Sequence, residues 1–179
     1  MILKGSKTEQ NLKLAFAGEC QAAVKYQYYA SKAKKDGYVQ MSEIFEQTSK
    51  NEKEHAKLWF KALHNGTVPS TLENLKDAAE GENYEWTEMY KEFAEVAREE
   101  GYDEIAELME GVACVEKHHE DRYKKLAKNI EEGKVFKRDT LVAWECLNCG
   151  HIRYWDSPSE VCPVCGHPQG YFELEKKNY

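Results

Sequence analysis

Two Glu-x-x-His motifs are the residues best placed to do chemistry. They are Glu52-Lys-Glu-His55 and Glu116-Lys-His-His119. Residues three apart on an α-helix lie on one face, a turn apart, so each carboxylate and imidazole can reach the same metal pair. Hard carboxylates combined with a few imidazoles suit iron or manganese. The spacing therefore predicts a carboxylate-bridged pair of metal ions.

Three further glutamates supply carboxylates from the other predicted helices. Glu19 interrupts an otherwise apolar helical stripe, and Glu85 and Glu88 precede Met89 on a broad apolar face. An unpaired carboxylate in a helical interior loses several kcal/mol of hydration unless it is protonated, paired or bound to a cation. For any one position, chance placement of a glutamate remains an alternative.

The level of these residues along the helices argues against chance. Glu19 lies eighteen residues before Gly37, and His55 lies eighteen residues after it. Glu85 lies sixteen residues before Gly101, and Glu116 lies fifteen after it. Since each helical residue rises about 1.5 Å, antiparallel helices bring these side chains to one layer.

Four cysteines form a second candidate metal site near the C-terminus. Cys146-x-x-Cys149 and Cys162-x-x-Cys165 are each followed by glycine, a spacing typical of a tetrahedral four-sulfur site. The same ligands bind structural zinc or redox-active iron. Taken alone, these residues favour zinc.

The elements that must position both sites follow from periodicity. Four long helical patterns fill residues 6–132, with the capping box Ser6-x-x-Glu9 opening the first. Beyond residue 134, prolines, glycines and alternating apolar residues indicate short strands and turns. We expect an all-α four-helix bundle over residues 1–137 and a small β-rich metal domain over residues 138–179.

Composition restricts the partners. The 179 residues carry a net charge of -7, with no cluster of basic residues for nucleic acid or an anionic membrane. No segment resembles a signal peptide or a run of eighteen apolar residues, so we expect a soluble, cytoplasmic protein. Cys20 and Cys114 lie within helical patterns and are given no chemical role.

The chain resembles the rubrerythrin family over nearly its whole length. The segments that carry the resemblance are 15–19 (AFAGE), 52–57 (EKEHAK), 85–90 (EWTEMY), 97–102 (AREEGY), 116–120 (EKHHE) and both cysteine knuckles. The resemblance implies a ferritin-like di-iron domain followed by a rubredoxin-like domain. It further implies a peroxidase that reduces hydrogen peroxide to water, in oxidative stress protection.

The resemblance also assigns roles to residues. It implies a di-iron (Fe–O–Fe) centre in which His55 replaces Glu88 at one iron when the pair is reduced. It favours iron over zinc as the metal of the cysteine site. On the inner stripe, Tyr26 is a candidate proton donor, with plain core packing as the alternative; Tyr102 is a weaker candidate. The ligands implied for the oxidised pair are Glu19, Glu52, Glu85, Glu88, Glu116 and His119.

Partners and competing functions complete the expectations. The resemblance implies electrons from rubredoxin or an NAD(P)H-dependent reductase, and a head-to-tail homodimer or higher homo-oligomer. No nucleic acid or membrane partner is expected. Two other functions fit the residues: a ferroxidase or iron-handling protein, and a non-catalytic interaction protein stabilised by zinc.

Overall fold

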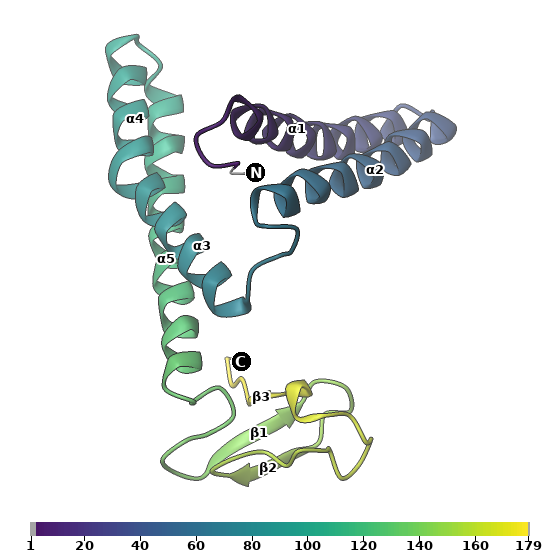
Figure 1. Cartoon of the computed structure of the whole chain (residues 1–179), viewed down its shortest axis with the longest axis vertical. Coiled ribbons are helices and arrows are strands. Elements are labelled where there is room, and N and C mark those ends of the chain that lie inside the picture. The colour runs from purple at the N-terminus through teal and green to yellow at the C-terminus, as the bar shows by residue number, and fades with distance from the viewer. Residues whose placement is uncertain (1–2, 179) are drawn as a thin grey trace. The chain divides into compact units, whose positions relative to one another are not determined.

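The computed structural model describes residues 3–178, which divide into two compact units with the boundary between Ser70 and Thr71. The first unit is a helical hairpin. The second contains three α-helices, one π-helical turn and a small antiparallel sheet. Figure 1 shows these elements in chain order.

Helices α1 (Lys7–Lys35) and α2 (Val39–Leu63) form the hairpin of the first unit (Figure 1). The predicted N-terminal cap is present, because the Ser6 hydroxyl accepts a hydrogen bond from the Glu9 amide at 3.1 Å. Gly37 ends the first helix with a φ of 86°, a left-handed conformation that glycine adopts without strain.

Small side chains let α1 and α2 approach closely. The Ser42 hydroxyl donates to the Ala30 carbonyl at 2.9 Å, and the Ser49 hydroxyl donates to the Ala23 carbonyl at 2.7 Å. These two bonds satisfy buried hydroxyls across the interface, where an unpaired hydroxyl would destabilise the fold. The buried residues of the hairpin are Ala23, Ala30, Ala33, Ser42, Ser49 and Ala56.

In the second unit, a helix with a widened turn runs alongside α5. Helix α3 (Thr71–Tyr84) continues through a π-helix (Glu85–Met89) into α4 (Tyr90–Glu99), and α5 (Asp103–Glu131) returns beside them (Figure 1). Ala94, Ala97 and Ala106 form the buried contact between α4 and α5.

The C-terminal module is a three-stranded antiparallel sheet in the order β2-β1-β3. Its strands are β1 (Val142–Cys146), β2 (Ile152–Trp155) and β3 (Phe172–Leu174), with a 3₁₀ turn at Gln169–Tyr171. Its core consists of Trp144, Cys146, Cys162 and Phe172.

The predicted fold class, mainly helical with a small β-rich C-terminal module, is confirmed. Of the residues within the predicted helical range, 71–99 form α3, the π-helix and α4 in direct succession. The domain boundary at residues 137 and 138 stays a prediction. Among residues 3–178, no helix combines the length and the apolar character needed to cross a membrane.

A leucine in place of Ala30, which is 2% exposed, should force α1 and α2 apart. We expect a loss of about 1–3 kcal/mol in unfolding free energy, because an added side chain of this size overpacks a closed interface. Urea unfolding, monitored by circular dichroism, measures this loss in unfolding free energy. Val24→Leu, on the same helix at a side chain that is 46% exposed, is the control. Equal midpoints for the two variants would contradict the close packing.

Candidate metal centres

The first unit brings together one carboxylate from α1 with a carboxylate and an imidazole from α2. Glu19, Glu52 and His55 each offer a ligand atom, and these atoms lie within 4.8 Å of one another. His55 Nδ1 is 2.8 Å from Glu52 Oε2 and 4.0 Å from Glu19 Oε2. The Glu-x-x-His spacing therefore places both side chains on one face of α2, as predicted from the sequence.

The second unit contains a matching group on α3 and α5. Glu82, Glu116 and His119 also offer ligand atoms within 4.8 Å of one another. His119 Nδ1 is 2.7 Å from Glu116 Oε2 and 3.6 Å from Glu82 Oε1. Burial raises the pKa of Glu82, and a hydrogen bond with Glu116 raises it further. The two carboxylates thus lie close enough to compete for one proton or one cation.

Glu85 and Glu88 lie in the π-helix directly after α3. Glu85 is half-buried, and its charge contributes to the raised pKa of Glu82. Burial raises the pKa of Tyr90, and the Glu85 charge adds to that shift. Glu88 is exposed. Since π-helical turns are rare and occur often at functional sites, this turn marks a candidate functional segment.

Sequence reasoning missed Glu82. It precedes Glu85 by three residues, so it occupies the same helical face one turn earlier, and this spacing was the available signal. Its proximity to Glu116 and His119 adds a carboxylate to the predicted set. The assignments of Glu85 and Glu88 as ligands stay predictions.

The donor chemistry of both helical groups fits hard divalent or trivalent cations. Each group contains two carboxylates and one imidazole. Oxygen-rich sets with imidazole suit iron or manganese better than the soft metals that prefer thiolate. Three donors fill about half of the six positions of an octahedral ion. Each group is therefore suited to hold part of a larger coordination sphere.

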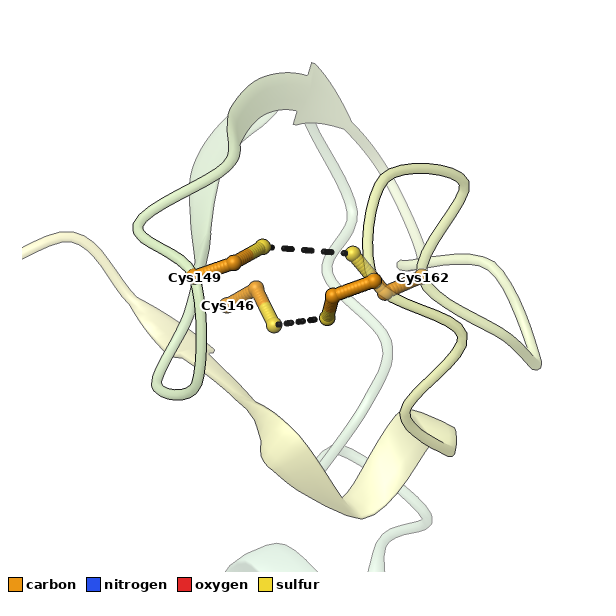
Figure 2. Close-up of side chains that lie close together, drawn as sticks. Cys146, Cys149 and Cys162 are labelled. Carbon is orange, nitrogen blue, oxygen red and sulfur yellow. Dashed lines mark hydrogen bonds between the residues drawn. The ribbon is translucent and has the colours of Figure 1, made fainter.

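The four cysteine sulfurs of the C-terminal module converge on one point, and Figure 2 labels Cys146, Cys149 and Cys162 there. Sγ of Cys146 is 3.7 Å from Sγ of Cys165, and Sγ of Cys149 is 3.7 Å from Sγ of Cys162. A tetrahedron with metal–sulfur bonds of about 2.3 Å has edges of about 3.8 Å. The sulfurs therefore fit one tetrahedral ion.

Backbone amides stabilise the thiolate form at this site. Gly150 and Gly166 adopt φ values of 72° and 73°, which turn the following backbone toward the sulfurs. The His167 amide lowers the pKa of the Cys165 thiol to about 6. The His151 amide acts in the same direction on Cys149, but burial and hydrogen bonds from the other thiols outweigh it and raise that pKa to about 12.

Comparison with known proteins decides the family. The protein-family model described as Rubrerythrin matches residues 10–127, and the family model described as Rubrerythrin, rubredoxin-like domain matches residues 144–173. The chain belongs to the rubrerythrin family. This membership supports a di-iron centre for the glutamate and histidine groups and a rubredoxin-type iron, in preference to zinc, for the four cysteines.

Several curated rubrerythrins are similar over nearly the full chain. Rubrerythrin of Clostridium perfringens is 50% identical, covering 99% of this chain and 98% of the relative. Rubrerythrin of Porphyromonas gingivalis is 47% identical, with 99% and 94% covered. Rubrerythrin of Nitratidesulfovibrio vulgaris is 46% identical, with 96% of each covered.

Metal affinity of the cysteine site should rise with pH. Binding must remove a proton from Cys149, whose raised pKa leaves it protonated at neutral pH, so metal and proton compete. We expect the apparent affinity for zinc or ferrous iron to increase at least about tenfold per pH unit between pH 6 and 8. Chelator competition, corrected for the protonation of the chelator, measures the slope. An affinity independent of pH would contradict a protonated Cys149.

Proposed function

We propose that the protein is a non-haem di-iron peroxidase that reduces hydrogen peroxide to water with electrons relayed through its four-cysteine iron. The observation that carries the proposal is the presence on one chain of two carboxylate–imidazole groups and a four-sulfur site. Membership of the rubrerythrin family supports a di-iron, rubredoxin-domain protein of oxidative stress. The peroxidase activity is the further step proposed here.

The proposed ligands of the iron pair come from both helical groups. Each group alone offers three donors, whereas a bridged pair needs about twice that number. We propose that Glu19, Glu52, Glu85, Glu116 and His119 would hold the iron pair, with Glu52 and Glu116 shared between the two ions, and that the pair would supply two electrons to peroxide. In this proposal Glu88 binds the oxidised pair, and His55 replaces it on reduction.

The stoichiometry explains why two kinds of iron site share one chain. Reduction of one peroxide consumes two electrons and two protons and yields two waters. When bound, the iron pair supplies both electrons at once. A four-cysteine iron carries one electron at a time, so it must be reduced and reoxidised twice for each peroxide. The protein's own residues must supply protons at the carboxylate site.

Electron donor, assembly and location are part of the same proposal. We propose rubredoxin or an NAD(P)H-dependent reductase as the donor and a head-to-tail homodimer as the smallest assembly. A partner chain in that arrangement can present its four-cysteine domain to the carboxylate site. The net charge of -7 and the absence of a basic cluster in the sequence fit action in the cytoplasm, away from nucleic acid and membranes.

Anaerobic stopped-flow mixing of the fully reduced protein with hydrogen peroxide tests the proposal. We expect the four-cysteine iron to reoxidise much faster with peroxide than with dissolved oxygen. Protein with zinc at the cysteines is the control, since it should consume a single equivalent of peroxide and then stop. Equal rates with the two oxidants would overturn the peroxidase activity. Faster oxidation by oxygen, with retention of added iron, would indicate a ferroxidase.

Tyr26 is the proposed proton donor. It lies on α1, two turns after Glu19, and is half-buried, with its ring centroid 6.0 Å from those of Tyr29 and Phe45. Removal of its hydroxyl in Tyr26→Phe should slow oxidation of the reduced protein by peroxide about 100-fold, the usual minimum for a general acid.

The same stopped-flow assay measures this effect. Tyr28→Phe removes a hydroxyl from the same helix at a side chain that is 67% exposed, and it should retain the original rate. If Tyr26→Phe and Tyr28→Phe react equally fast, Tyr26 serves only to pack against its aromatic neighbours.

A further inference from the structure

Glu120 is the most buried carboxylate among the described residues, at 3% exposure. It follows His119 directly on α5 but belongs to neither group of metal-binding side chains. A buried carboxylate without partners would destabilise the fold by several kcal/mol. Its partners therefore indicate what it does.

Three donors surround this carboxylate. Asn83 Nδ2 donates to Oε1 at 2.9 Å, and Trp86 Nε1 donates to Oε2 at 2.5 Å. Lys124, one turn further along α5, forms an ion pair with Oε1. Both oxygens are thus occupied, and two of the three donors come from the neighbouring helix.

The positions of those two donors are informative. Asn83 directly follows Glu82, and Trp86 directly follows Glu85 as the second residue of the π-helix. A π turn has less favourable geometry than an α turn and persists where surrounding contacts hold it. The Thr87 hydroxyl also donates to the Asn83 carbonyl at 2.7 Å, and the Lys117 ammonium lies 5.8 Å from the centre of the Trp86 ring.

We propose that Glu120 is a positioning residue that holds the π turn in register against α5 and so directs the carboxylates of that turn toward Glu116 and His119. Glu120 directly follows His119, and its carboxylate accepts hydrogen bonds from Asn83 and Trp86, which directly follow Glu82 and Glu85. The inference rests on the proposed di-metal centre, because its effect is exerted on the ligands of that centre. Substitution of residues that orient metal ligands without binding the metal commonly lowers metal affinity by about 10- to 100-fold.

Two substitutions at residue 120 separate geometry from charge. Glu120→Gln keeps an acceptor for Trp86, and the Asn83 amide can rotate to accept from the new NH₂ group, so both bonds to the neighbouring helix are preserved and only the Lys124 ion pair is lost. Glu120→Met has similar length but offers no acceptor and strands both donors. Trp86→Phe removes one donor and leaves the Asn83 bond intact.

Manganese binding to the full-length protein is the test, with zinc filling the four-cysteine site. Free Mn(II) is followed by electron paramagnetic resonance, and the spectrum of the bound, coupled pair reports the bridging geometry. We expect Glu120→Met to bind the second Mn(II) at least tenfold more weakly, with an altered pair spectrum. Glu120→Gln should stay within twofold of the original protein and keep its spectrum, and Trp86→Phe should fall between them.

Two controls isolate the effect. Lys124→Met removes the ion pair but leaves the Asn83 and Trp86 donors, and it should bind Mn(II) normally. Ser42→Ala removes a buried hydrogen bond in the other unit and should lower stability without changing the pair spectrum.

The inference is overturned if Glu120→Met keeps the original affinity and spectrum, or if Glu120→Gln is as impaired as Glu120→Met. Should Glu120→Met fail to fold, unchanged binding by Trp86→Phe overturns it. A protein that binds the metal pair normally but does not react with peroxide would refute the proposed function and leave the role of Glu120 standing.

Discussion

Carboxylates that face one another from neighbouring helices repel, and the repulsion grows where water is partly excluded. Each helical unit of this chain accepts that cost, since two carboxylates and an imidazole lie within 4.8 Å of one another in each. Burial and the neighbouring Glu116 carboxylate raise the pKa of Glu82, as expected when two such groups lie together. A cation removes the repulsion, and the donor types select iron or manganese as that cation.

The C-terminal module depends on its metal in a different way. Its core is so small that two of the four residues in its buried hydrophobic cluster, Cys146 and Cys162, also belong to the four-cysteine site. Burying Trp144 and Phe172 around the sulfurs therefore joins folding to metal binding. In the helical units, by contrast, the buried contacts consist mainly of alanines, with two serines in the hairpin, and the carboxylates and imidazoles of the candidate metal groups are not part of that buried set.

Much of this arrangement could be predicted from spacing alone. Glu-x-x-His places Glu52 beside His55 by local geometry, and the repeated Cys-x-x-Cys spacing predicted that the two cysteine pairs meet, as their sulfurs do. The metal at the cysteines could not be predicted from residues, since zinc and iron accept the same ligands; family membership decided it. The spacing of Glu82 and Glu85 shows only that they share a face, whereas the approach of Glu82 to Glu116 and the hydrogen bonds of Glu120 depend on contacts of α3 and the π-helix with α5, which no pattern within one helix encodes.

The π turn also sets the phase of everything that follows it. Because an α-helix advances about 100° per residue, one surplus residue in a turn rotates the next helix by that angle. In the observed register, Ala94 and Ala97 on α4 pack against Ala106 on α5. Excision of a single residue from 85–89 would swing those alanines away from α5 and bring charged side chains into the seam. The segment that contains Glu85 and Glu88 thus also determines which face of α4 is buried, so a change in its length would require a new contact between α4 and α5.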